Sequence, residues 1–116
     1  MRYKEPQPIS RDAASHVFET GSPEEICDAL IGVTFHDPDW RWVQDRCLEF
    51  LSHESPDVRG LAATCLGHIA RIHGALDQDA VVPALQRLRA DPQVGGRAED
   101  ALDDIRMFLG DSGAIR

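Results

Sequence analysis

The amino-acid sequence predicts an all-α protein, and two observations support this fold class. First, a residue that can cap a helix stands directly before a proline at four places. Such a residue accepts hydrogen bonds from the free N–H groups of the first turn, and proline lacks the N–H that would be unpaired there. Second, no segment alternates apolar and polar residues with period two, so we expect no strands. The four pairs are Ser22-Pro23, Asp37-Pro38, Ser55-Pro56 and Asp91-Pro92.

These signals, read in order along the chain, predict six helices. At the second start, Ser22 and Glu25 form the sequence pattern of a capping box, in which each residue bonds the backbone N–H of the other. The expected helices span 10–20, 23–35, 38–52, 56–73, 78–90 and 92–109. The glycines that stand where helices would end are Gly21, Gly74 and Gly110.

Two of these segments contain residues that disfavour a helix. Pro83 is expected to kink the fifth helix or to shift its start, because proline donates no backbone hydrogen bond. Gly95 and Gly96 weaken the start of the sixth helix, since glycine loses the most backbone freedom on folding. The regular part of the sixth helix is therefore expected to begin near Arg97.

The chain of 116 residues is expected to form one domain, residues 10–110, which is long enough to bury a core of its own. Residues 1–9 are expected to be an N-terminal extension and residues 111–116 a C-terminal tail, both poorly ordered. The N-terminus carries charges and prolines where a signal peptide would be apolar, and no apolar run is long enough to span a membrane. With three widely spaced cysteines, this predicts a cytoplasmic protein with reduced thiols.

The net charge is −8, from 12 lysines and arginines against 20 aspartates and glutamates. This balance argues against a nucleic-acid or membrane-surface partner, because both of these carry negative charge. It is compatible with a basic protein partner. The alternative is that the acidity serves only to keep the chain soluble.

An internal repeat links three of the predicted helices. The helix starts at 23, 56 and 92 are separated by 33 and 36 residues, a spacing found in helical repeats. The apolar residues of the second and third copies align with each other, whereas the first copy keeps only some of them, as a terminal repeat often does. The matching sets are Val58, Ala62, Cys65, Leu66 and Ile69 against Val94, Ala98, Ala101, Leu102 and Ile105.

The central copy resembles the HEAT repeat and its relative, the bilin-lyase-type HEAT-like repeat. The resemblance rests on Asp57-Val58-Arg59, Ala62-Ala63 and Leu66-Gly67, and also on the turn-like segment DPDWR at 37–41. It implies a right-handed α-solenoid of about three helix pairs. In that family the position of Arg59 is held by an arginine that pairs with acidic groups between repeats, so Arg59 is expected to be structural.

Small residues in the central helix are consistent with a stacked array, because they let neighbouring helices approach closely. An interior glycine costs about 1 kcal/mol relative to alanine, so Gly67 is expected to repay that cost through packing. The sequence offers no reason for the second interior glycine, Gly60.

No pattern in the sequence indicates catalysis, a metal or a cofactor. His68 and His73 are five apart and point about 140° from each other on a helix, and neither H-E-x-x-H nor C-x-x-C occurs. Cys47 and Cys65 fall on apolar stripes and Cys27 lies in a half-apolar helix, so these thiols are expected to be buried and inert. We therefore expect no catalytic residue, no metal ligand and no cofactor.

The last helix carries an acidic ridge on its polar side, which we define as Glu99, Asp100, Asp103 and Asp104. Like charges four residues apart repel, so the ridge is a candidate contact for a basic partner. A structural reason also exists, because acids near a helix start favour its dipole.

A second candidate patch comprises Trp42 together with Glu24, Glu25 and Asp28. Trp40 and Trp42 point about 200° from each other, so Trp40 is expected to join the core while Trp42 lies toward the other side. An exposed tryptophan is a common interface anchor, but Trp42 could equally cover the neighbouring helix pair.

Size, acidity and the segments DPDWRW and PDVRGLAATCLGHI are similar to those of the small HEAT-like immunity proteins of bacterial toxin systems. That resemblance implies a non-enzymatic, monomeric inhibitor that binds a cognate toxin. A nuclease toxin would be basic, because its substrate is a polyanion. The alternatives are a general HEAT adaptor or scaffold, and an enzyme of the bilin-lyase type.

Overall fold

The computed structural model describes residues 6–110, and six helices lie within that range. They are α1 (Arg11–Thr20), α2 (Pro23–His36), α3 (Trp40–Phe50), α4 (Pro56–His73), α5 (Gln78–Leu88) and α6 (Gly95–Leu109). The predicted all-α fold is confirmed. Residues 1–5 and 111–116, which include the expected C-terminal tail, lie outside the described residues.

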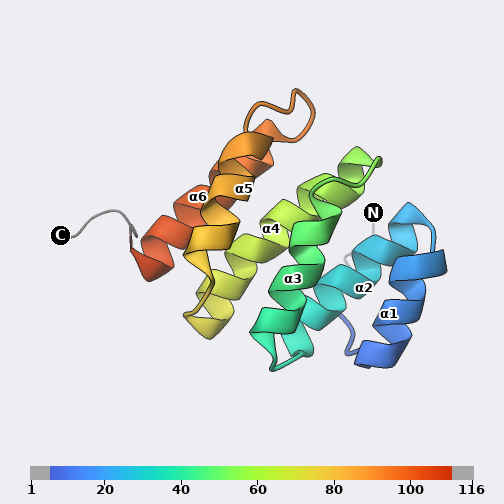
Figure 1. Cartoon of the computed structure of the whole chain (residues 1–116). Helices are drawn as coiled ribbons and strands as arrows, with labels where there is room; N and C mark the ends of the chain where they lie inside the picture. The colour runs from blue at the N-terminus through green and yellow to red at the C-terminus, as the bar shows by residue number, and fades with distance from the viewer. Residues whose placement is uncertain (1–5, 111–116) are drawn as a thin grey trace.

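The helices form three pairs stacked in two layers (Figure 1). The first helices of the pairs, α1, α3 and α5, form the layer that we call the first-helix layer. The second helices, α2, α4 and α6, lie side by side as the second-helix layer, with α4 between α2 and α6. The central helix therefore contacts both of its repeat neighbours and also α3.

The Ser-Pro pairs and the Asp-Pro pairs start their helices differently. After Ser22 and Ser55 the helix begins at the proline itself, and the capping box of Ser22 and Glu25 is present, with hydrogen bonds of 3.2 and 2.8 Å. After Asp37 and Asp91 the carboxylate instead accepts N–H groups of a short turn, and the helix begins only after that turn. As a result α3 begins at residue 40 and α6 at residue 95, where the sequence predicted 38 and 92.

The expected effects of proline and glycine inside helices are only partly observed. The fifth helix begins at Gln78 as predicted and continues through Pro83, so its start is not shifted. The sixth helix begins at Gly95, two residues before the predicted Arg97, because the turn at 92–94 already aligns the chain. Neither glycine delays the helix.

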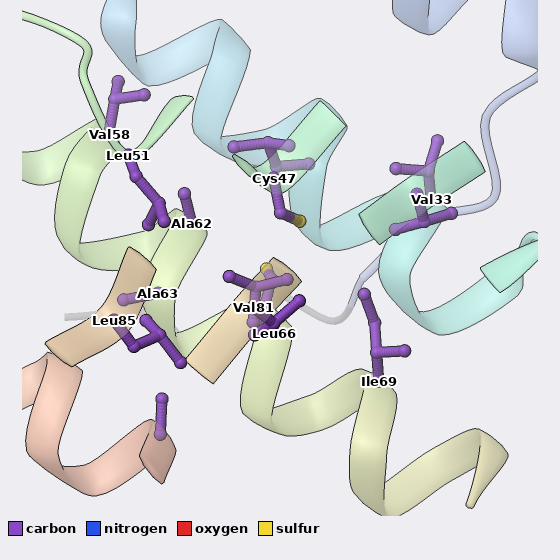
Figure 2. Packing of buried hydrophobic residues seen from close by; sticks show 14 of the residues in the cluster. Val33, Cys47, Leu51, Val58, Ala62, Ala63, Leu66, Ile69, Val81 and Leu85 are labelled. Atoms are coloured by element: carbon purple, nitrogen blue, oxygen red, sulfur yellow. The ribbon is translucent and has the colours of Figure 1, made fainter. Parts of the chain in front are cut away.

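The core runs the length of the stack between the two layers. Figure 2 shows Val33 of α2, Cys47 of α3, Leu66 of α4 and Val81 of α5 directed into this interior. All four are fully buried, as the apolar stripes predicted.

The glycines of α4 are places where α6 comes close. A Cβ on Gly67 would lie 3.3 Å from the Cα of Ala101 and 2.9 Å from Oδ2 of Asp104. A Cβ on Gly60 would lie 2.7 Å from Nη1 of Arg97. Both glycines therefore leave room for the close approach of α6. This explains Gly60, for which the sequence offered no reason.

Arg59 ties the second helix pair to the third, as its place in the repeat predicted. Its Nε donates to Oδ2 of Asp91 over 3.1 Å, and Nη2 donates to Oε1 of Gln93 over 3.1 Å. Its Nη1 donates to the carbonyl oxygens of His53 and Glu54. One half-buried guanidinium therefore joins the loop before α4 to the turn before α6.

Residues 6–9 pack on α2, which corrects the expectation that this segment is poorly ordered. The side chain of Ile9 is partly buried against the core, and the carbonyl oxygen of Pro6 lies 3.1 Å from Nε2 of His36. Gly32 leaves room for this segment, since a Cβ there would lie 2.6 Å from the carbonyl oxygen of Gln7.

Gly67→Ala is expected to lower the free energy of unfolding by about 1–2 kcal/mol, because the added methyl group meets the backbone of α6. Gly60→Ala is the matched control. There the exposed Arg97 side chain can move aside, and alanine's helix propensity offsets the lost contact to within about 1 kcal/mol. Urea denaturation of both variants measures the difference, and a Gly67→Ala protein as stable as the wild type would contradict the close approach.

Asp91→Asn is expected to lower the melting temperature at pH 7 while leaving an oxygen to cap the turn. Backbone N–H donation, first from Gln93, and the neighbouring Arg59 lower the pKa of Asp91 from its ordinary value of 3.8. Its charge therefore stabilises the fold above pH 3.8, and this contribution is lost as the pH falls through the lowered pKa. Melting curves from pH 7 to acid should show the gap to the wild type narrowing below that value; a constant gap would disprove the charge effect.

Candidate protein-binding face

The acidic excess of the described helices is concentrated in the second-helix layer. Helices α2, α4 and α6 carry eight acidic and four basic side chains, whereas α1, α3 and α5 carry five and four. One of those four basic side chains, Arg59, is committed to the structural tie with Asp91. Counted over the described helices, the second-helix layer is therefore the more acidic of the two layers, and we call its open side the second-helix face.

The structure divides the acidic ridge of α6 into two rows. In the outer row, Glu99 lies 3.4 Å from Nη2 of Arg89 and Asp103 lies 3.0 Å from Nη1 of Arg106. In the row nearer α4, Asp100 and Asp104 form no ion pair with any described residue. Each carboxylate of the outer row therefore lies beside an arginine, whereas those of the inner row have no ion-pair partner among the described residues.

A cation of α6 is held beside the inner row. The side chain of Arg97 lies across Gly60, and its Nε donates to Oγ1 of Thr64 over 3.2 Å. Thr64 in turn donates to the carbonyl oxygen of Gly60. Since Arg97 is anchored on α4, it moderates the acidic charge at the start of α6 more than at Asp104, which lies two turns further along.

The acids of α2 lie on the same layer, two helices away from the ridge. Glu24, Glu25 and Asp28 are all exposed in the first two turns of α2. The carboxylate of Glu25 is already engaged in the capping box with Ser22. Glu25 and Asp28 also line a groove of about 700 Å³ between α2 and residues 6–9. The structure thus places these acids on the second-helix layer without bringing them into contact with the ridge.

Trp42 lies apart from the other candidate residues, in the first-helix layer between α1 and α3. Its ring centroid is 6.5 Å from that of Phe18, and the guanidinium carbons of Arg11 and Arg46 lie 4.7 and 5.7 Å from the ring centre. These contacts give it a packing role between two helix pairs. Trp40 is likewise half-buried against the core, so the expected contrast between the two tryptophans is not seen.

Near the C-terminal ends of the second helices, an aromatic contact joins α2 to α4. The rings of Phe35 and His68 are 5.2 Å apart, and Nδ1 of His68 lies 3.1 Å from Nη2 of Arg71. Partial burial, together with the charge of Arg71, lowers the pKa of His68. The imidazole is therefore mainly neutral at pH 7.

Three large apolar side chains near this end are exposed, and the sequence did not single them out. The exposed fractions are 37% for Ile72, 73% for Met107 and 43% for Phe108. Each falls in the last turn of its helix, on the polar side of the predicted stripe. Reading the last turns for apolar residues that lie off the stripe could have found them.

The described residues do not assemble a metal-binding group. Within residues 6–110, no three side chains of the His, Cys, Asp and Glu types lie close enough to hold a metal ion. Cys47 and Cys65 are fully buried against each other, and contact with Cys65 together with burial raises the pKa of Cys47. No helix of the described part is long and apolar enough to cross a membrane.

Comparisons with known proteins agree with this picture. The HEAT repeat family model matches residues 43–73, which cover most of α3 and all of α4. Over 93% of its length the chain is similar to one chain of the "Crystal structure of CDI complex from Cupriavidus taiwanensis LMG 19424". The match has 38% sequence identity and a TM-score of 0.84, and it covers 97% of that chain. A comparison with curated proteins finds no match.

The native protein is expected to react with a thiol reagent at Cys27 alone, and slowly. Burial is the main cause that raises the pKa of the half-buried Cys27, and the other two thiols are inaccessible. Titration at pH 7 with and without denaturant measures this, and all three thiols should react once the chain is unfolded. Rapid reaction in the native state would contradict the buried arrangement and favour a thiol-dependent enzyme.

Proposed function

We propose that this chain, which belongs to the same HEAT-like protein family as the matched chain of the CDI complex, is an immunity protein. CDI denotes contact-dependent inhibition, in which one bacterial cell delivers a toxin to its neighbour. The observation that carries the proposal is the likeness to a chain of such a complex along nearly the whole of both sequences. In the proposal the protein acts as a cytoplasmic monomer, without catalysis, nucleic acid or membrane, by binding a cognate toxin.

The charge of the second-helix face suggests the chemistry of the toxin. A nuclease must attract phosphates and so has a basic active site. Carboxylates set along α6 can take the place of phosphates there, with Asp100 and Asp104 as the main contacts and Glu99 and Asp103 beside them. Each ion pair formed near 4 Å at a protein surface contributes about 1–4 kcal/mol before desolvation. The same field accelerates association, which favours inhibition before the toxin acts.

The remaining candidate residues have secondary places in this proposal. Glu24, Glu25 and Asp28 lie on the same layer as the ridge, so a toxin domain that spans α2 to α6 would reach both groups. Trp42 lies in the first-helix layer, so a contact there would be a separate one. Its packing between Arg11 and Arg46 accounts for its position without a partner.

A general HEAT adaptor is the second candidate, and the match of residues 43–73 to the HEAT model is the observation that favours it. An adaptor would bind a cellular protein and would give no protection from a toxin. The enzyme of the bilin-lyase type has less support, because Cys47 and Cys65 are buried away from any substrate.

The experiment that tests the proposal uses the gene immediately upstream. Its C-terminal region is expressed with this chain, and the mixture is examined for a complex that co-purifies. A tight complex that abolishes a nuclease or other toxic activity is the expected result. Absence of a complex would contradict the immunity function and leave the adaptor, to be pursued by affinity capture from the native cell.

Asp100→Asn/Asp104→Asn is expected to weaken this complex by about tenfold or more, because both carboxylates lack an intramolecular cation. The matched control is Glu99→Gln/Asp103→Asn, which removes the same charge from the row whose carboxylates lie beside Arg89 and Arg106. Calorimetric titration at constant salt should show the larger loss for the first pair. Equal affinities for both variants and the wild type would exclude the ridge as the contact.

A further inference from the structure

The ends of α4 and α6 carry apolar side chains that the charge of the ridge does not explain. Ile72, Met107 and Phe108 are the large apolar side chains of the described range that are exposed. Single exposed apolar residues are ordinary, but a group at one end of one layer indicates an interaction site. These residues therefore call for a reason other than folding.

Ile72 and Phe108 occupy the same position in successive repeats. They are 36 residues apart, which is also the separation of the matching buried residues Val58 and Val94. Arg97 of α6 contacts Gly60 of α4, and Asp104 contacts Gly67. The two contacts are therefore seven residues apart on each helix. The two helices thus run in the same direction in fixed register, and their last turns are neighbours.

The apolar surface continues across the layer toward α2. His68 lies one turn before Ile72 on α4, and its neutral ring contacts Phe35 of α2. We call the set of Phe35, His68, Ile72, Met107 and Phe108 the apolar band. It crosses the end of all three second helices. The acids of α2 lie at the opposite end of the same face, whereas those of α6 lie in the middle of their helix, next to the band.

Charge complementarity specifies what can cover the band. Asp104 lies one turn before Phe108, and it has no cationic partner among the described residues. Asp100 lies one further turn away and is also unpaired. The cation within the band, Arg71, lies against Nδ1 of His68. An apolar group entering beside Phe108 therefore meets unpaired negative charge one turn away, which a purely apolar occupant would leave unmatched.

We propose that the apolar band is the anchor of the toxin contact, and that it receives a large apolar side chain of the toxin whose neighbouring lysine or arginine reaches Asp104 and Asp100. This inference rests on the proposed immunity function and deepens it by naming a second kind of contact on the same face. Binding energy at interfaces is concentrated in such buried apolar centres, with charged groups at the rim. The acids then guide the encounter, and the band holds the complex.

The test is a calorimetric titration of the upstream-encoded C-terminal polypeptide with full-length variants at low and moderate salt. Met107→Ala/Phe108→Ala is expected to raise Kd by about tenfold or more without changing its salt dependence. Asp100→Asn/Asp104→Asn is expected to reduce the salt dependence. Val82→Ala is the matched apolar control outside the band, and unfolding curves verify that every variant remains folded.

The possible outcomes separate the band from the function on which it rests. If the wild type binds and Met107→Ala/Phe108→Ala binds equally well, the band is excluded and the immunity function stands. If the wild type does not bind, the proposed function fails and the band fails with it. If sedimentation shows a wild-type dimer that the double variant dissolves, with toxin affinity unchanged, the band joins two copies of this chain and the inference is overturned.

Discussion

The close approach of α6 to α4 is the constraint on which the rest of the structure depends. Glycines at 60 and 67 leave room for it, and the side chains that enter are Arg97 and Asp104. These two contacts fix the register of α6 against α4, so they determine the position of every acid on α6 relative to α4. It also divides the ridge, because the row that faces α4 is kept away from Arg89 and Arg106.

Most of the fold could be predicted because its signals are local. Capping residues, prolines and apolar spacing are read over a few residues, and the three second helices begin within three residues of the predicted positions. The misplaced starts at Asp37 and Asp91 share one cause. An aspartate can bond the N–H groups of a turn as readily as those of a helix, and the sequence alone does not say which it will do.

The candidate site could be predicted less completely, because it depends on contacts between helices. Spacing on α6 placed four acids on one side, but it could not show that Arg89, from the end of the preceding helix, would pair with Glu99. The same limit applies to Trp42, whose neighbours Arg11 and Phe18 come from another helix pair. Ile72 and Phe108 could have been noticed as apolar residues off the stripes of their helices, but the sequence could not show that the last turns of α4 and α6 are neighbours.

The measurement that tests this account most directly is oxidative footprinting of the complex with the upstream-encoded polypeptide. Hydroxyl radicals label exposed Met107 and Phe108 on the second-helix face, and half-exposed Trp40 and Trp42 on the first-helix layer. The account predicts that binding protects Met107 and Phe108 and leaves both tryptophans unchanged. Protection of the tryptophans with continued labelling of Met107 would contradict it and place the partner on the opposite side of the molecule.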